Sequence, residues 1–140
     1  MQVREGMSSV ILAVGAGHTL REAATLMSEK QVGAAVVNDE ELPGPGIVSE
    51  RDVLRSIGAG QDPDTELVRD HMSDSVIMAS PEWSLERAAT EMSRRHIRHL
   101  VVTEGGEVVG ILSMRDIMRV WTSHGATSAM ESPEAEASRT

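Results

Sequence analysis

Residues 7–58 of this chain recur as residues 72–123, and this internal repetition restricts the fold more than any other feature of the sequence. The dipeptide Met7-Ser8 returns 65 positions later as Met72-Ser73. The segment "GIVSERDVLR" at 46–55 returns 64 positions later as "GILSMRDIMR" at 110–119, so one residue has been lost in a turn. Each copy alone is too short for a comfortable hydrophobic core, and the two copies are expected to fold together.

The pattern of apolar residues predicts the same elements in both copies. One apolar helix face with i, i+3, i+4, i+7 spacing consists of Leu20, Ala23, Ala24 and Met27 in the first copy and of Leu85, Ala88, Ala89 and Met92 in the second. Thr19 and Ser84 precede these helices as N-caps. Strands are predicted at residues 10–14, 34–37 and 46–49, and again at residues 76–79, 99–103 and 108–113.

A second helix is predicted to begin at Ser49 and at Ser113. The side chains expected on its inner face are Val53, Leu54 and Ile57 in the first copy and Ile117, Met118 and Trp121 in the second. The order strand, helix, strand, strand, helix therefore occurs twice, which predicts an α/β (α+β) fold.

The repetition also divides the chain into residues 1–61 for the first repeat and residues 62–124 for the second. Residues 58–65 are polar and are predicted to link the two. Residues 125–140 contain almost nothing apolar, so we expect a disordered C-terminal tail. Because Tyr and Phe are absent, the core is expected to be aliphatic, with Met filling its gaps.

Composition and charge exclude several classes of function. The 22 acidic residues outnumber the 13 basic ones, and the net charge of −9 repels a nucleic-acid polymer. The absence of cysteine excludes a disulfide framework, a thiol nucleophile and a thiolate metal site. No apolar run approaches the length of a membrane span, so we expect a soluble, cytoplasmic protein with no membrane contact.

Catalytic and metal-binding patterns are weak. His96 and His99 do not share a helix face if His99 begins a strand, and no neighbouring carboxylate completes a ligand set, so no metal is predicted. The sequence contains no recognisable Ser, His and acid constellation and no glycine-rich phosphate loop. We therefore predict that the protein is not an enzyme.

These features together resemble a cystathionine-β-synthase (CBS) domain pair, a stand-alone tandem CBS module. The resemblance is carried by "TLREAATLMSEKQVGAAVV" with "GIVSERDVLR", and by "SLERAATEMSRRHIRHLVV" with "GILSMRDIMR". It implies two sheets around a pseudo-twofold axis, two clefts between the repeats, and a homodimer. It also implies a regulatory role toward a separate, unidentified protein. No cofactor is required, and AMP, ADP, ATP or S-adenosylmethionine are the implied regulatory ligands.

Two interpretations apply to the repeated serine-aspartate pairs, Ser49 with Asp52 and Ser113 with Asp116. The spacing is that of a capping box, in which the hydroxyl accepts from a first-turn N–H and the carboxylate lies favourably at the helix N-terminus. The resemblance adds a binding role, because an exposed carboxylate can accept from both ribose hydroxyls while the serine hydroxyl and first-turn N–H groups meet a phosphate.

The resemblance further implies that each carboxylate shares its cleft with the other repeat. Asp52 would face Val76, Ile77, Arg98 and His99, and Asp116 would face Ile11, Leu12, Gly33 and Ala34. Arg98 and His99 resemble phosphate-contacting positions of the family, whereas Gly33 and Ala34 offer only close backbone approach, so unequal clefts are predicted.

Arg51 and Arg115 reach either a phosphate or only the surface. Arg94 and Arg95 are interpreted as a solvated helix end.

The preferred hypothesis is thus a regulatory module that senses adenosine-containing nucleotides in its clefts. The alternative is a structural module that dimerises or binds a partner protein and leaves its clefts empty. A panel of nucleotides in a thermal-shift assay distinguishes the two, because empty clefts give no shift with any compound.

Overall fold

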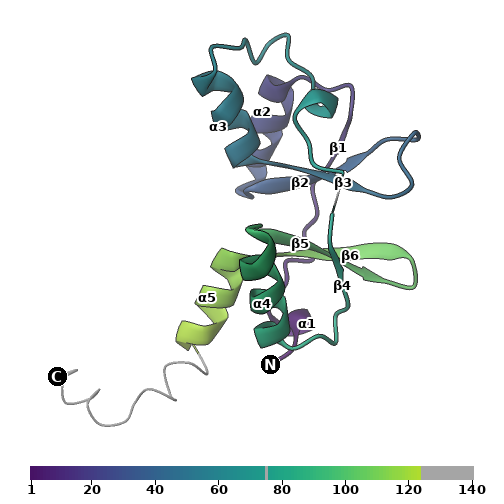
Figure 1. Ribbon diagram of the computed structural model, residues 1–140, viewed down its shortest axis with the longest axis vertical. Coiled ribbons are helices and arrows are strands. Elements are labelled where there is room, and N and C mark those ends of the chain that lie inside the picture. The colour runs from purple at the N-terminus through teal and green to yellow at the C-terminus, as the bar shows by residue number, and fades with distance from the viewer. Residues whose placement is uncertain (75, 124–140) are drawn as a thin grey trace, which may run out of the picture. The chain divides into compact units, whose positions relative to one another are not determined.

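The computed structural model describes residues 1–74 and 76–123, and these form a mixed α/β fold with two compact units (Figure 1). One unit, called the contiguous unit below, is Val10–Ile77. The other, the composite unit, joins Met1–Ser9 to the chain from Met78 onward. The predicted tail at residues 125–140 lies outside the described residues. Each unit holds one three-stranded sheet with helices packed on it.

In the contiguous unit the sheet has the order β1 (Ala13–Gly15), β2 (Ala34–Asn38), β3 (Gly46–Ser49). β1 runs parallel to β2, and the helix α2 (Leu20–Lys30) connects them. β3 runs antiparallel to β2 and leads directly into α3 (Glu50–Gly58). The short helix η1 (Val68–Asp70) completes the unit.

α2 begins where the sequence predicts. Thr19 Oγ1 accepts from the Glu22 N–H at 3.1 Å, and the Glu22 carboxylate accepts from the Thr19 N–H at 2.9 Å, which together form a capping box. Leu20, Ala23 and Met27 are buried, so the predicted apolar face does pack inward. The helix ends at Gln31, whose left-handed backbone (φ 59°) closes the last turn.

The composite unit repeats this plan with the sheet order β4 (Met78–Ala79), β5 (His99–Glu104), β6 (Glu107–Ser113). α4 (Leu85–Arg95) connects the parallel pair and is capped by Ser84, whose hydroxyl accepts from the Arg87 N–H at 3.0 Å. α5 (Met114–Ser123) follows β6, and α1 (Val3–Gly6) packs on α4 and α5. Because His99 begins β5, it shares no helix face with His96.

The predicted inner faces of the second helices are correct for Val53 and Ile117 and wrong for Leu54, Ile57 and Met118. α3 buries Val53 and Ser56, whereas Leu54 and Ile57 are 69% and 51% exposed. α5 buries Ile117 and Val120, while Met118 is 53% exposed and Trp121 is half-buried. The serine caps fix where each helix starts and thereby its rotation. A hydroxyl can occupy the inner face of α3 because Ser56 Oγ donates to Gln61 Oε1 at 2.8 Å.

The first strands also differ from the prediction, because both are shorter. β1 begins at Ala13 rather than at Val10, which is 59% exposed, and β4 consists of Met78 and Ala79 alone. The Leu12 carbonyl still accepts from the Val36 N–H at 2.9 Å. The chain before β1 is therefore held against the sheet without being a regular strand.

Segments that precede the first strand of each repeat pack on the other repeat. Residues 66–73, which precede β4, belong to the contiguous unit, and residues 1–8, which precede β1, belong to the composite unit. We call these the leading segments.

Their backbone pairing is the same in both units. The Val68 N–H donates to the His18 carbonyl, and the Val3 N–H donates to the Trp83 carbonyl, each at 2.8 Å. The two valines are fully buried. Two further backbone contacts occur in both units. The pairing of Ser73 with Ile47 is equivalent to that of Ser8 with Ile111. The hydrogen bond between Leu20 and Glu66 is equivalent to that between Leu85 and Met1. The boundaries of the compact units therefore differ from those of the sequence repeats, since each unit contains the leading segment of the other repeat. The division at residues 61 and 62 was based on the sequence repeats.

Candidate functional site

The strongest site prediction concerns the turn from the last strand of each sheet into the following helix, at Ser49 and at Ser113. Asp52 Oδ2 accepts from the Ser49 N–H at 2.7 Å, and Asp116 Oδ2 accepts from the Ser113 N–H at 2.9 Å. Each serine hydroxyl accepts in return from the N–H of its aspartate, at 3.4 Å and 3.0 Å respectively. The capping-box interpretation is thus confirmed in both units, and all four side chains are half-buried. We call these two turns the joints.

The second oxygen of the two aspartates differs between the joints. Asp116 Oδ1 accepts from Arg119 Nη2 at 3.3 Å, and the same guanidinium lies 3.4 Å from the Gly6 carbonyl. The equivalent arginine in the contiguous unit is Arg55. Among residues 1–74 and 76–123, no hydrogen bond or ion pair reaches Asp52 Oδ1. Asp52 therefore has one carboxylate oxygen without a partner among the described residues, whereas both oxygens of Asp116 accept a hydrogen bond.

Each joint lies beside the start of the central strand of its own sheet. The Glu50 N–H donates to the Gly33 carbonyl, and the Met114 N–H donates to the Arg98 carbonyl, both at 2.9 Å. The strand register pairs Ala34 with Ser49 and His99 with Ser113. Arg98 and His99 therefore lie next to Ser113 in the composite unit. Their predicted grouping with Asp52 involves both units and stays a prediction.

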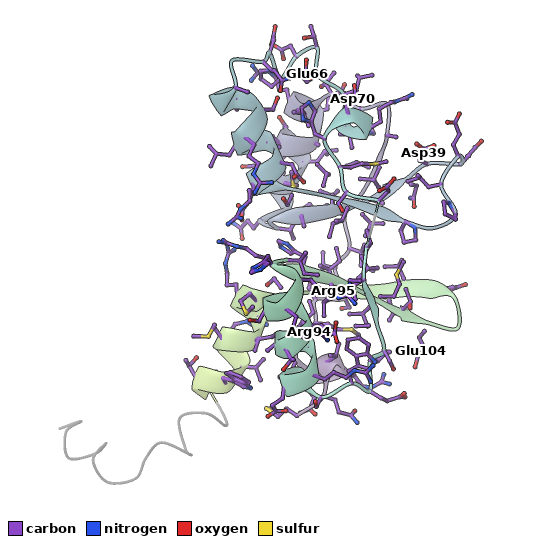
Figure 2. The ribbon with its side chains drawn as sticks, in the orientation of Figure 1. Asp39, Glu66, Asp70, Arg94, Arg95 and Glu104 are labelled. Carbon is purple, nitrogen blue, oxygen red and sulfur yellow. The ribbon has the colours of Figure 1, made fainter. Side chains whose placement is uncertain are left out.

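The three arginines within residues 94–98 of the composite unit differ in their pairing. Arg94 and Arg95, labelled on α4 in Figure 2, contact the Glu91 carboxylate at 3.3 Å and 3.0 Å. The hydrogen bond from Arg95 is the main reason that the pKa of Glu91 lies below its ordinary value. Arg98 is exposed and forms no ion pair within the described part of the chain. It is therefore free to meet an anionic ligand, while Arg94 and Arg95 are already paired.

The apolar residues predicted to contact a ligand differ in their access to solvent. Leu12 is only 8% exposed and belongs to the core of the contiguous unit with Val14 and Leu20, and its role as a ligand contact stays a prediction. Ile11, Val76 and Ile77 are half-buried. Arg51 and Arg115 are exposed on the first turns of α3 and α5.

The two units differ strongly in charge. Val10–Ile77 contains twelve acidic and five basic residues, among them Asp39, Glu66 and Asp70 in Figure 2. The composite unit, counted through Ser123, contains seven of each. The acidity of the chain is thus concentrated in one unit, and an anion is repelled less by the unit that carries Arg98.

Sequence reasoning missed two side chains at the joints, Glu50 and Arg119. Glu50 could have been found by comparing the repeats position by position, since it stands where the second copy has Met114, but Arg119 could not, because the first copy also has an arginine there, Arg55. No helix among the described residues is long and apolar enough to cross a membrane. The same residues contain no group of His, Asp and Glu side chains that could hold a metal ion.

Two copies of one sheet-and-helix plan, each with a capped serine-aspartate joint, define a tandem-repeat protein. The CBS domain family model matches residues 2–59 and 68–123, so the chain belongs to the CBS domain family.

Relatives and solved structures agree with this assignment. The CBS domain-containing protein YhcV of Bacillus subtilis is 32% identical over 116 residues, which is 82% of this chain and 81% of YhcV. Three other relatives are longer, and the chain spans only 53%, 32% or 46% of their length.

Among solved structures, the hexameric CBS-CP12 protein from bloom-forming cyanobacteria has a TM-score of 0.81 and 27% identity, and the match covers 89% of this chain and 75% of that one. The CBS domain protein PAE2072 from Pyrobaculum aerophilum, solved in complex with AMP, has a TM-score of 0.74 and 31% identity. That match covers 89% of this chain and all of PAE2072.

Proposed function

We propose that the protein is a regulatory module that binds an adenosine-containing ligand at its two joints and transmits the bound state to a separate partner protein. The observation that carries this proposal is that the chain offers both an accepting carboxylate oxygen and a cationic side chain without a partner among the described residues. Asp52 Oδ1 has no partner among the described residues, and Arg98 is exposed without an ion pair. A ribose and a phosphate need these two kinds of group.

The AMP complex of PAE2072 supports the same ligand class, because that protein is a full-length match at 31% identity. AMP is the simplest candidate ligand, followed by ADP, ATP and S-adenosylmethionine. The proposed role is one of binding without turnover. It uses Ser49, Asp52 and Arg51 from one joint, and Ser113, Asp116 and Arg115 from the other, together with Arg98 and His99.

Isothermal titration calorimetry with AMP tests the proposal on the full chain. A charge-assisted hydrogen bond contributes about 1.5–3 kcal/mol, so Arg98→Ala should weaken AMP about tenfold or more. The matched control is Arg94→Ala, which removes an arginine already bound to Glu91 and should change the affinity less than about twofold. Asp52→Ala should damage the same, tighter site as Arg98→Ala, and affinity should fall as salt rises.

Two results would overturn the proposal. One is the absence of heat and of any thermal shift with AMP, ADP, ATP, NAD and S-adenosylmethionine. The other is equal weakening by Arg94→Ala and Arg98→Ala, which would indicate a general charge effect. If Asp116→Ala abolished the tighter site while Arg98→Ala left it intact, the predicted grouping of Asp52 with Arg98 would be wrong.

A second candidate function, dimerisation or partner binding without a ligand, is favoured by the exposed apolar side chains of α3 and α5. Leu54, Ile57 and Met118 are each more than half exposed. Leu54 and Ile57, three residues apart, share one face of α3, and exposed apolar surface commonly marks a protein-protein contact. We propose that a second copy of the chain covers it, and that ligand binding and dimerisation coexist.

A further inference from the structure

Arg119 connects the composite joint to the leading segment 1–8. Its Nη2 atom donates to Asp116 Oδ1 at 3.3 Å and to the Gly6 carbonyl at 3.4 Å. Asp116 is the carboxylate of the composite joint, and Gly6 is the last residue of α1. One guanidinium therefore contacts both the candidate ribose acceptor and a segment that, by sequence, belongs to the first repeat.

Close packing brings the Gly6 carbonyl within reach of this guanidinium. Gly6 is buried, and a Cβ atom built on it would lie 3.2 Å from Val120 Cγ2 and 3.6 Å from side-chain atoms of Leu112 and Leu85. The backbone of α1 thus lies close to α5, with little space for a side chain between them. A carbonyl at the end of a helix lacks an intrahelical partner, and an arginine can supply one. Arg119 therefore helps to hold the leading segment on α5.

The contiguous unit has the same arginine but not the same contact. Arg55 occupies the position of Arg119, and His71 occupies that of Gly6. The Arg55 side chain is exposed and forms no hydrogen bond or ion pair within residues 1–74 and 76–123. His71 instead contacts the Glu66 carboxylate at 2.7 Å. Among the described residues, the link from joint to leading segment therefore occurs in the composite unit only.

A ribose at the composite joint would compete with Arg119 for the carboxylate. Asp116 Oδ2 already accepts from the Ser113 N–H at 2.9 Å as part of the capping box, so Oδ1 is the oxygen that can exchange its donor. The Arg119 side chain is 62% exposed and that of Asp116 is 22% exposed, so water already weakens their contact. An exposed ion pair of this kind is favoured by about twofold to fivefold. A hydroxyl pair that needs Oδ1 is weakened by a similar factor.

We infer that Arg119 is a positioning residue that makes the leading segment 1–8 respond to a ligand at the composite joint. Ribose hydroxyls displace the guanidinium from Asp116, and the Gly6 carbonyl then loses a donor that Asp116 had held in place. Coupling between two sites is reciprocal, so the ligand loosens the segment by the same factor by which the contact weakens the ligand. This inference rests on the proposed function, and it gives the bound state a structural readout at residues 1–8. It also agrees with a tighter site at Asp52, whose Oδ1 has no partner among the described residues.

Calorimetry on the full chain tests the competition in an Asp52→Ala background, which leaves the composite joint as the remaining proposed site. Adenosine is the probe, because it has the ribose hydroxyls but no charge, and AMP replaces it if adenosine gives no heat. Arg119→Met keeps the aliphatic stem and removes the donors, so it should tighten binding about twofold to fivefold. Arg55→Met is the matched control. It removes the same charge from the equivalent position and should change the affinity less than about 1.5-fold.

Amide hydrogen exchange on the wild-type chain tests the coupling. With the saturating probe, the N–H groups of Val3 and Ser8 should exchange about twofold to fivefold faster. Those of Val68 and Ser73 lie in the other leading segment, where the described residues show no such arginine contact, and they should not accelerate. In Arg119→Met, residues 1–8 should exchange faster even without the probe and should not respond to it.

Three results would show that the inference is wrong. Arg119→Met and Arg55→Met could change the affinity equally, residues 1–8 could exchange at the same rate with and without the probe, or Asp52→Ala could bind neither probe both with and without Arg119→Met. Melting curves verify that each variant is folded. A wild-type chain that binds neither adenosine nor AMP would instead refute the proposed function, and this inference with it.

Discussion

Val3 offers the sharpest test of how the units are built. It lies in the leading segment 1–8, which by sequence belongs to the first repeat, yet its side chain is fully buried in the composite unit. Val3→Ala removes two methyl groups, which is about 1.6 kcal/mol of transfer free energy at about 0.8 kcal/mol per group. The cavity that remains raises the expected loss to about 2 kcal/mol. For a chain of this size, that loss lowers the melting temperature by about 4–8 °C.

Equilibrium unfolding in urea, at one protein concentration, measures this loss directly. Val68→Ala is the matched variant, since Val68 occupies the same place in the other leading segment and is equally buried. Val10→Ala is the control, because Val10 is 59% exposed and its truncation should stay within about 0.5 kcal/mol.

Amide hydrogen exchange then assigns the effect to a unit. Val3→Ala should accelerate exchange in β5 and β6, which belong to the composite unit. A Val3→Ala variant as stable as Val10→Ala, or one that loosens only β1 to β3, would refute the exchange of leading segments.

Two further predictions follow from the same contacts and surfaces. A fragment of residues 10–77 retains Val68 and the pairing of Ser73 with Ile47, so it should show a cooperative urea transition by circular dichroism, whereas a fragment of residues 1–61 lacks both and should show none. The full chain should sediment as a homodimer at micromolar concentration, and Leu54→Glu should shift it toward the mass of one chain because it places a charge on the exposed apolar face of α3. Sedimentation of the unaltered chain as a monomer over that range would contradict the second prediction, and a folded 1–61 fragment would contradict the first.

The sequence predicted those features whose causes are local. The capping boxes at Thr19, Ser49 and Ser113 depend on two side chains three residues apart, and all three occur as expected. The duplication made the order of strands and helices clear, because each copy supported the interpretation of the other.

Features that depend on tertiary contacts were predicted less well. α3 buries Ser56 beside Val53, although periodicity favoured the apolar Leu54. Ser56 can be buried because its hydroxyl donates to Gln61, a residue beyond the end of the helix, and the sequence pattern does not reveal that contact. The early strand predicted at Val10 failed for the same reason, since apolar character alone does not specify pairing.

The candidate site shows a similar division. The serine-aspartate joints were predicted because they follow a pattern, and Arg98 was selected because it resembles a phosphate-contacting position of the family. The close approach of the Glu50 carboxylate to Gly33 could not be predicted from either residue alone. Only the fold brings the carboxylate into the space that a side chain at position 33 would need.

The exchanged leading segments have a consequence for how such a chain could have arisen. A polypeptide with a single repeat would carry a leading segment that fits another repeat, and it would leave its own sheet uncovered. It could bury both only by trading segments with a second copy, as in domain swapping. Fusion of the two copies turns that exchange into an intramolecular step with an effective concentration in the millimolar range for a short linker. A fused chain of this kind folds at dilutions where separate single-repeat chains would come apart.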